Sequence, residues 1–340
     1  MFITEEALKN SSAKLVNKGD LLYALYGATS GEVDISQING AINQAILCIR
    51  SDCIDVRFLA YLLFFKKENI INTYLQGGQG NLSTEIIKNI ELFFPNTQNE
   101  SKKLIKFFEI IDKRIEKQRQ LVESLKKYKR GLLSAIFERK IRFSTNGWVN
   151  YKIGQLGCFY NGLSGKNKDD FGLGNNEFIT YMNVYKNTVA DIQMCEKVNI
   201  ANNEKQNKVK FGDIMFTQSS ETLEEVGFSS VWLEDKNPYL NSFCFGFRLF
   251  DSDNFLPLFL AYYLRSDFIR KLIMREGQGV TRVNLSSERL KNINLHLPDI
   301  QEQNKIANFI FKYDNKIKMV ESILKKQELI KKSLLQQMFI

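Results

Sequence analysis

Few side chains in this sequence have the types and spacing that catalysis requires. The single histidine, His296, lies in the alternating run INLHLP, which leaves histidine triads, histidine pairs and zinc sites without the groups they need. The run NGLSGK at 161–166 lacks the G-x-x-x-x-G-K-S/T spacing of a phosphate-binding loop. NPY at 237–239 lacks the second proline of the Asn-Pro-Pro-aromatic motif of amino-methyltransferases, and Glu224 and Glu225 have no recognisable metal or base partner. We therefore expect no catalytic residue, no metal site and no cofactor.

Cysteine spacing and hydropathy indicate where in the cell the protein is located. The five cysteines are widely spaced and form no C-x-x-C pair, which is typical of reduced thiols inside the cell. They are Cys48, Cys53, Cys158, Cys195 and Cys244. The chain opens without a basic segment followed by an apolar run, and no stretch of about 18 apolar residues is present to span a bilayer. We expect a cytoplasmic protein with no membrane partner.

The formal net charge of +9 is concentrated in two tracts. Residues 99–142 hold 14 Lys and Arg against 6 Asp and Glu, and residues 299–340 hold 8 against 5, while the remainder carries a net charge of −2. A basic chain favours a polyanionic partner, but the location of the charge matters more than its sum. The two tracts, and not the segments between them, carry the positive charge.

The sequence contains an internal duplication. NKGDLLYAL from Asn17 aligns with KFGDIMFTQ from Lys210, and FLAYLL at 58–63 aligns with FLAYYL at 259–264. From Glu100 onward the pairing has no gap at an offset of 202 residues, so that Asp112 stands opposite Asp314 and Phe137 opposite Phe339. A repeat of this length predicts two similar copies of one structural unit.

Each copy ends in a long helix. The two tracts lack an internal proline, follow Pro95 and Pro298, and carry apolar residues at intervals of three and four, which predicts helices of roughly 36 residues with a coiled-coil seam. The predicted seam residues are Ile115, Val122, Leu125, Leu132, Ile136, Ile317, Val320, Leu324, Leu334 and Met338. Only about ten residues, 138–147, join the first helix to the second copy, so the second helix can bury its seam against the first only by running antiparallel to it. The alternative is that each helix packs on its own head.

The predicted fold is mixed α/β heads joined by two long helices that form an antiparallel coiled coil, with pseudo-twofold internal symmetry. The predicted boundaries are a first head at 1–98, a first helix at 99–142, a second head at 143–298 and a second helix at 299–340. The first head lacks roughly 47 residues that correspond to the opening of the second, so we expect it to lack several strands. A truncated gene product, a fragment of a rearranged locus, and a head completed by another chain all remain open.

Three motifs in this order resemble a known family. They are NGWVNYKIGQLG at 146–157, GDIMFTQSSETLEEVGFSSVW at 212–232, and NINLHLPDIQEQNKIANFI at 292–310 leading into a helix that closes with KKSLLQQMF. Together they resemble the DNA-specificity subunit of type I restriction-modification systems. The first copy departs from the pattern, since FPNTQNESKKLIKFF replaces the usual Pro-x-x-x-Glu-Gln start of the helix.

The resemblance implies a non-catalytic subunit whose heads are target recognition domains. Each would read half of a bipartite site in double-stranded DNA. The helices would set the spacing of the two halves and dock two methyltransferase subunits, while restriction or translocase subunits would join through the complex. The competing interpretations are a coiled-coil scaffold and a non-functional remnant, neither of which selects a DNA sequence.

Three polar loops of the second head are the predicted DNA contacts, because amides, hydroxyls and guanidinium groups read base edges and hold phosphates. The predicted contact residues are Thr217, Gln218, Ser219, Ser220 and Thr222 in TQSSET, Gln278, Thr281, Arg282 and Asn284 in GQGVTRVN, and Lys166 and Lys168 in SGKNKDD. The open alternatives are a locally bonded polar turn for the first loop, a loop that fastens head to helix for the second, and a solvated loop for the third. The first copy keeps Gln79 and Asn81 but has no Thr-Arg pair, which makes Arg282 the more informative candidate.

The basic residues of the first helix have two interpretations. They are Lys113, Arg114, Lys117, Lys126, Lys127, Lys129 and Arg130. Such a set is commonly a solvated helix face, and otherwise it binds partner subunits or DNA. Because the heads are close to neutral, we expect weak DNA binding by a head alone.

Overall fold

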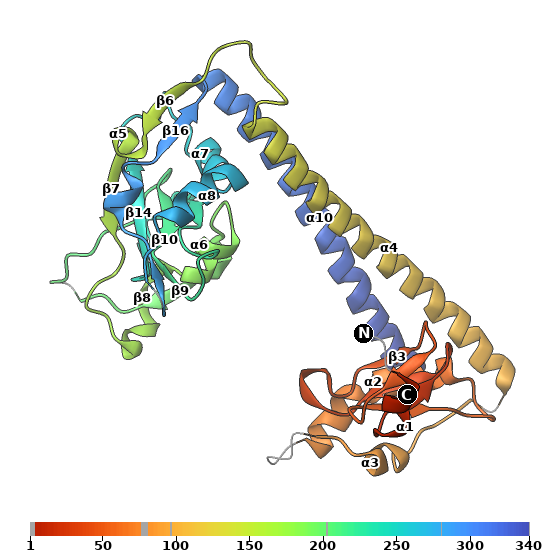
Figure 1. The fold of residues 1–340 in the computed structure, drawn as a ribbon. Helices are drawn as coiled ribbons and strands as arrows, with labels where there is room; N and C mark the ends of the chain where they lie inside the picture. Colours follow the sequence, from red (N-terminus) through yellow and green to blue (C-terminus); the bar gives the residue numbers. More distant parts are fainter. Residues whose placement is uncertain (1–3, 76–80, 96, 202, 280, 340) are drawn as a thin grey trace. The chain divides into compact units, whose positions relative to one another are not determined.

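The computed structural model describes residues 4–75, 81–95, 97–201, 203–279 and 281–339. The chain divides into two compact units, the first made of Met1–Glu123 and Lys318–Ile340 and the second of Ser124–Ile317. The long helices α4 (Gln98–Phe137) and α10 (Ile300–Met338) each belong partly to both units (Figure 1). Both helices are somewhat longer than expected, and the predicted boundary at residue 142 falls after the end of α4. The predicted division into heads and helices as separate domains stays a prediction.

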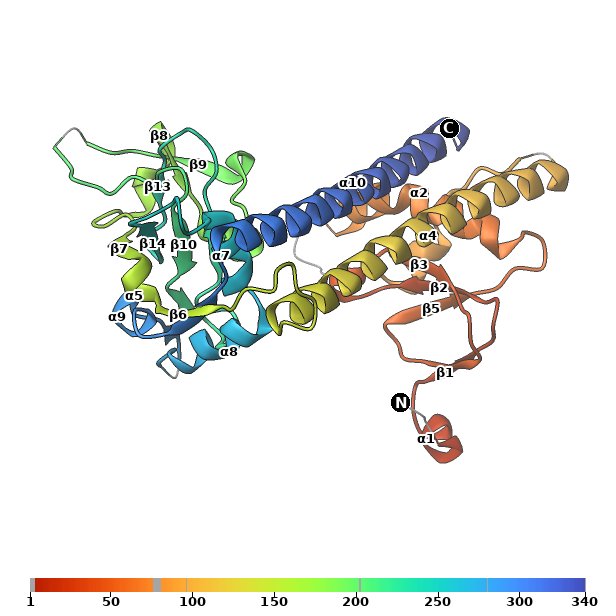
Figure 2. The ribbon, with the colours of Figure 1, turned by 90° about the horizontal axis from the view of Figure 1, so that it is seen from above.

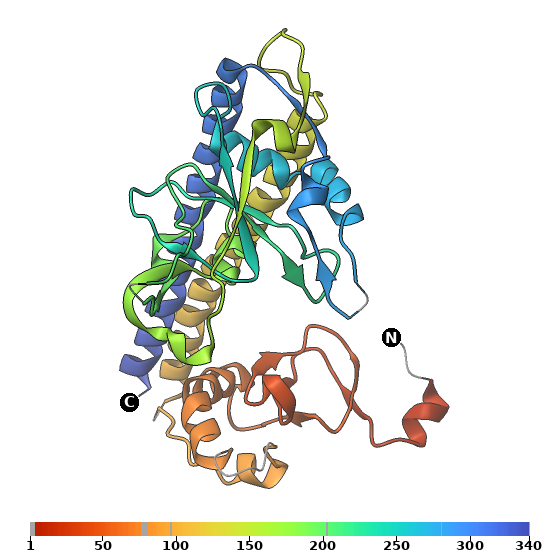
Figure 3. The ribbon, with the colours of Figure 1, turned by 90° about the vertical axis from the view of Figure 1, so that its left-hand side faces the viewer.

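The head of the first unit is small and combines short strands with helices. Its three-stranded antiparallel sheet has the order β3-β2-β5, and β1 pairs with β4. Its elements are α1 (Glu5–Lys9), β1 (Lys14–Val16), β2 (Leu21–Ala24), a 3-10 turn (Gly27–Thr29), β3 (Val33–Ile35), β4 (Gly40–Ile42), β5 (Ile46–Ile49), α2 (Val56–Tyr74) and α3 (Thr84–Lys88). Helix α2 lies next to β2 and β3 (Figure 2), while α1 stands apart from the sheet (Figure 3).

The repeated FLAY segment of the first copy lies in α2. Asp55 caps this helix by accepting a hydrogen bond from the backbone N–H of Arg57 at 3.0 Å. Phe58 is 1% exposed, and its ring lies 5.3 Å from that of Phe339 at the end of α10. The segment is therefore a packing element that fixes the first head to the helices.

The head of the second unit is larger and contains more strands. Its main sheet has the order β12-β10-β14-β7, a second sheet has the order β13-β8-β9, and the pairs β16-β6 and β11-β15 complete it. All pairs between named strands in the described part of this head are antiparallel except β13 with β8. Its elements are β6 (Val149–Lys152), α5 (Ile153–Leu156), β7 (Gly157–Asn161), β8 (Phe171–Ile179), α6 (Tyr181–Lys186), β9 (Cys195–Val198), β10 (Ile214–Thr217), β11 (Ser219–Ser220), β12 (Ser229–Val231), β13 (Tyr239–Leu240), β14 (Cys244–Leu249), α7 (Pro257–Leu264), α8 (Asp267–Arg275), β15 (Val283–Asn284), α9 (Ser287–Leu290) and β16 (Asn294–Leu297), with 3-10 turns at Lys168–Asp170 and Ile192–Met194.

The core of the second head includes the ends of both long helices. Phe216 of β10, Phe247 of β14 and Phe259 of α7 belong to one buried cluster. Ile136 of α4 and Ile306 of α10 belong to the same cluster. The only histidine of the sequence, His296, lies on β16 with its Nε2 2.6 Å from the carbonyl oxygen of Trp148. Its imidazole therefore joins β16 to the strand region that opens the head.

Helices α4 and α10 run antiparallel to each other in each unit, as the sequence predicts. In the first unit Arg119 forms an ion pair with Glu328 at 3.0 Å, and the ring of Phe108 lies 5.7 Å from that of Phe339. As residue numbers fall along α4, those of the contacting residues rise along α10. In the second unit the rings of Tyr128 and Tyr313 lie 5.8 Å apart.

Most of the predicted seam is at least half-buried. Ile115, Val122, Ile136 and Ile317 are buried, and Leu125, Leu132, Val320, Leu324 and Leu334 are half-buried. The exception is Met338, which is 39% exposed, whereas Leu335 is 1% exposed. The prediction for Met338 is wrong because an α-helix drifts by about 20° per heptad relative to a strict seven-residue repeat. Near the end of α10 the buried position is Leu335, and Phe339, directly after the helix, lies against Phe58 and Phe65 of α2.

Across the described residues, no helix is both long enough and apolar enough to cross a bilayer.

Candidate nucleic-acid interface

Two of the three predicted contact loops meet in the second head. Strand β11 pairs with β15 antiparallel, with Ser219 opposite Asn284 and Ser220 opposite Val283. The backbone N–H of Leu285 then donates to the carbonyl of Gln218 at 2.8 Å. TQSSET and GQGVTRVN, distant in sequence, therefore form one hydrogen-bonded junction.

Thr217 is the anchor of the first loop and is 0% exposed. Its hydroxyl accepts a hydrogen bond from the N–H of Phe228 at 2.9 Å and donates to the carbonyl of Glu225 at 3.2 Å. Ser220 is also buried, and its hydroxyl donates to the carbonyl of Thr222 at 2.5 Å. These hydroxyls hold the loop in shape, so the predicted side chains that remain open to a ligand are those of Gln218, Ser219 and Thr222. Glu221 of the same loop is also exposed.

The second loop is closed by paired backbone bonds and presents Arg282. The N–H of Gln278 donates to the carbonyl of Asn284 at 2.9 Å, and the N–H of Asn284 donates back at 2.7 Å. Gly279 has φ +122°, and a Cβ there would lie 2.0 Å from the carbonyl oxygen of Arg282, so the turn requires glycine. Thr281 and Arg282 are exposed. The turn therefore fixes where the Arg282 side chain leaves the backbone.

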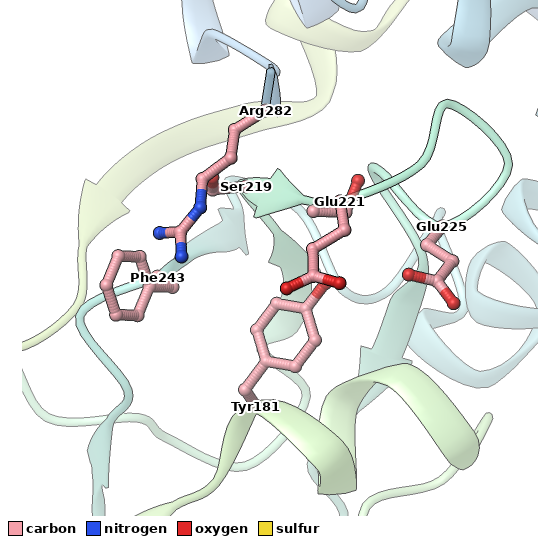
Figure 4. A pocket seen from close by; sticks show the side chains of 7 residues that line it. Tyr181, Ser219, Glu221, Glu225, Phe243 and Arg282 are labelled. Carbon is pink, nitrogen blue, oxygen red and sulfur yellow. The ribbon is translucent and has the colours of Figure 1, made fainter.

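A cleft of about 300 Å³ lies beside this junction. It is lined by Tyr181, Ser219, Ser220, Glu221, Glu225, Phe243 and Arg282. Figure 4 shows Arg282 and Glu221 reaching into the same space from different loops, with the ring of Phe243 near the guanidinium and the ring of Tyr181 near the carboxylate. Tyr181, Phe243, Glu221 and Glu225 are absent from the sequence-predicted set. The available signals were the aromatic runs ITYMNVY and NSFCF, in which Phe243 is 53% exposed.

Two arginines of the α7–α8 region, Arg265 half-buried and Arg270 buried, hold the walls of the cleft. Arg265 donates from its guanidinium to the carbonyls of Tyr185 at 2.6 Å and Asn187 at 2.8 Å, which fixes α6 and hence Tyr181. Arg270 donates to the carbonyls of Glu224 at 3.0 Å and Val226 at 2.6 Å, which fixes the loop that carries Glu221. Burial lowers the pKa of both arginines to about 10, so both remain charged at neutral pH.

The polar groups of the cleft differ in whether they have partners. Glu225 accepts a hydrogen bond from the hydroxyl of Tyr185 at 3.2 Å. The buried hydroxyl of Tyr181 has no hydrogen-bond partner among the described residues. Burial raises the pKa of Tyr181 to about 12, so this hydroxyl is a neutral donor at physiological pH.

The third predicted loop contributes no residue to the lining of this cleft and is organised differently. The side chain of Lys166 is 4% exposed, and its Nζ lies 2.6 Å from Glu204 and 3.8 Å from Asp170. The prediction that Lys166 grips a DNA phosphate fails on geometry, because its ammonium is buried between two carboxylates. Lys168 is exposed on a 3-10 turn and stays a prediction.

The first head contains the same loop junction. A β-bridge joins Tyr26 to Asn81, and the N–H of Leu82 donates to the carbonyl of Leu25 at 3.0 Å, which matches the bonding of Ser219, Asn284, Leu285 and Gln218. Gln79 lies outside the described residues. Asn81 and Asn284 therefore occupy equivalent scaffold positions, although Asn284 is exposed.

Within the described parts of the chain, no group of three or more His, Cys, Asp and Glu side chains is arranged to hold a metal ion.

Among the predicted basic set on α4, Lys129 is engaged, with its Nζ 2.5 Å from Asp314 of α10. Lys113, Arg114, Lys117, Lys127 and Arg130 are exposed.

Two α/β heads with the same loop junction, on long helices paired antiparallel, define a duplicated recognition protein. The model of the type I restriction modification DNA specificity domain matches residues 2–127 and 145–329, and the chain belongs to this family. The family is the DNA-recognition part of type I restriction-modification systems, so the chain is a DNA-specificity subunit.

Known relatives agree with this assignment. The type I restriction enzyme MjaVIII specificity subunit of Methanocaldococcus jannaschii is 22% identical over 336 residues, which cover 94% of this chain and 77% of that protein. A solved chain from a study of complex assembly and conformational transition of the type I R-M system has a TM-score of 0.63 and 15% identity, covering 97% of this chain and 84% of the other. The type I restriction-modification S subunit from M. genitalium has a TM-score of 0.56 and 17% identity, covering 96% and 84%. The structural likenesses show a shared fold.

Proposed function

We propose that this subunit reads a bipartite DNA site, one half through each head. The observation that carries the proposal is the repeated loop junction, Tyr26 with Asn81 in the first head and Ser219 with Asn284 in the second. A duplicated junction supports two contacts of the same kind on one duplex. In the second head the junction borders a cleft with an exposed arginine, which supports reading of base edges there.

The paired helices are proposed to set the distance between the two half-sites. Helix α4 has 40 residues and α10 has 39. At about 1.5 Å per residue such a helix is roughly 60 Å long, which corresponds to about 18 base pairs at 3.4 Å each. The pairing of α4 with α10 within each unit supports a stiff element of this kind.

The same helices are proposed to dock methyltransferase subunits. They carry apolar side chains that are largely exposed, which is typical of a surface that a partner covers. These are Ile110 at 67%, Leu121 at 45%, Tyr128 at 59%, Met319 at 67%, Leu329 at 65% and Ile330 at 56%. The internal repeat supports two such subunits, and restriction or translocase subunits would join through the complex.

In this proposal the partner subunits carry methyl transfer and cleavage, and the chain itself is not an enzyme. In the same proposal the subunit works in the cytoplasm, together with the DNA that it reads. A coiled-coil scaffold that does not read DNA is not favoured, because the family match covers both heads.

The experiment is selection from a random double-stranded DNA pool by the full chain, purified with its methyltransferase subunits. We expect two short fixed motifs separated by a gap of constant length. A single motif would contradict reading by both heads, and the absence of any enrichment would contradict DNA recognition by this chain.

A further inference from the structure

The charge of the cleft does not suit a DNA phosphate. Among its lining residues Arg282 is the cation, while Glu221 and Glu225 are carboxylates. A phosphate in this space would be attracted by one guanidinium and repelled by two carboxylates. The cleft is better suited to a neutral partner that both donates and accepts hydrogen bonds.

Arg282 and Glu221 are the groups in the cleft that such a partner can use. Within the described part of the chain, neither the guanidinium of Arg282 nor the carboxylate of Glu221 has a hydrogen-bond or ion-pair partner, whereas Glu225 is bonded to Tyr185. Both side chains point into one space from two loops that β11 and β15 tie together (Figure 4). Arginine only donates hydrogen bonds and an ionised glutamate only accepts them. The matching partner must present acceptors beside a donor.

The major-groove edge of a G·C pair has this pattern. Guanine offers the acceptors O6 and N7, and the N4 amino group of its cytosine is a donor beside them. An A·T pair offers the adenine N7 acceptor, the adenine N6 donor and the thymine O4 acceptor. The donor lies between the two acceptors, so neither base presents two adjacent acceptors to an arginine. The arginine therefore matches guanine, and the carboxylate matches cytosine.

Resting on the function proposed above, we propose that the second head reads a G·C base pair in this cleft. Arg282 donates to O6 and N7 of guanine, and Glu221 accepts from N4 of the paired cytosine. Glu221 is then a specificity-determining residue, although its carboxylate has the sign that DNA phosphates repel.

The cleft walls support this assignment. Phe243 is 53% exposed beside the guanidinium, and the hydroxyl of Tyr181 is buried without a partner among the described residues. Aromatic walls exclude water from a bound base edge, which strengthens hydrogen bonds formed inside.

The test compares sequence selection by the full chain and its Arg282→Ala, Arg282→Lys and Glu221→Gln variants, each purified with its methyltransferase subunits. The pool is random double-stranded DNA. Glu224→Gln is the matched control, because Glu224 is exposed on the same loop and does not line the cleft. Thermal unfolding checks that each variant is folded.

We expect the wild-type motif to contain a G·C pair whose preference falls by about 5- to 150-fold in Arg282→Ala and in Glu221→Gln, at the same position in both. Arg282→Lys should keep overall affinity but lose part of the preference, and Glu224→Gln should select the wild-type motif. The inference is overturned if Arg282→Ala weakens binding equally at all sequences, if Glu221→Gln leaves the motif intact, or if the motif has no G·C pair. If the wild-type protein selects no sequence at all, the proposed function fails together with the inference.

Discussion

Lys129 of α4 forms an ion pair with Asp314 of α10, with 2.5 Å between Nζ and Oδ1, and the hydroxyl of Tyr262 donates to Oδ2 of the same carboxylate at 2.8 Å. The other half of the molecule repeats this arrangement. Lys331 lies 2.5 Å from Oδ1 of Asp112, and the hydroxyl of Tyr61 donates to Oδ2 at 2.8 Å. In each unit one carboxylate therefore joins the repeated FLAY helix, its own long helix and the opposite long helix.

Replacing Lys129 with Met should destabilise the protein by about 1–3 kcal/mol, because Asp314 is 19% exposed and would lose its charged partner. The measurement is the free energy of unfolding in urea. The control is Lys127→Met, since Lys127 is exposed on the same helix. Equal effects of the two substitutions would show that the Lys129 pair contributes nothing specific.

The phase of the seam at the end of α10 can be tested with two truncations. Leu335→Ala should cost about 2–5 kcal/mol because Leu335 is 1% exposed, whereas Met338→Ala should change the free energy of unfolding by less than about 0.5 kcal/mol. Both values come from urea unfolding. The opposite order would restore the seam predicted from the sequence, with Met338 inside it.

Stability should fall in alkaline solution. Burial is the main cause that raises the pKa of Tyr61 and of Tyr262 above the ordinary value of about 10. The neighbouring carboxylate, Asp112 for Tyr61 and Asp314 for Tyr262, raises each pKa further through its hydrogen bond and its charge. The unfolded chain therefore releases these protons first, so the stabilisation is complete below pH 10 and is lost as pH rises above it. We expect the urea midpoint to fall more steeply above pH 10 in wild type than in a Tyr61→Phe/Tyr262→Phe double variant. Parallel curves would mean that other groups control the alkaline limb.

The Gly279 turn should be needed for recognition more than for folding. Gly279→Ala forces a side chain into a φ of +122° and against the Arg282 carbonyl, so the loop must move. We expect a loss of about 1–2 kcal/mol in stability and a weakened second motif in DNA selection, with the first motif retained. Gly147→Ala, with open space around its Cβ position, is the control. If the Gly279→Ala variant selects the second motif as strongly as wild type does, the turn is not needed for DNA recognition.

The sequence predicts the parts of the fold that depend on periodicity and repetition. The offset of 202 residues places Asp112 opposite Asp314, and these two carboxylates have equivalent partners in the structure. The short connection after α4 predicts the antiparallel pairing of the helices. Both inferences use only spacing and chain length, which tertiary contacts do not alter.

The cleft depends on contacts between distant segments, and sequence patterns reveal little of it. Tyr181 reaches the cleft because Arg265 holds α6 in place, and Glu221 because Arg270 holds its loop. The prediction for Lys166 is wrong because a lysine in a glycine-containing loop has the same local sequence whether its ammonium is solvated or, as here, paired with Glu204. The residues of the SGKNKDD loop are compatible both with a buried ion pair of Lys166 and with a contact between Lys166 and a phosphate.

The central claim is that two heads read one DNA site at a distance set by the long helices. It is tested most directly by inserting seven helix-forming residues after Glu123 in α4 and seven before Lys318 in α10. Seven residues lengthen a helix by about 10 Å, and this length corresponds to roughly three base pairs. They change the rotation of the helix face by only about 20°. Selection from random duplex DNA should return both wild-type motifs with the gap widened by about three base pairs. Unchanged spacing, with both motifs still present, would contradict the account.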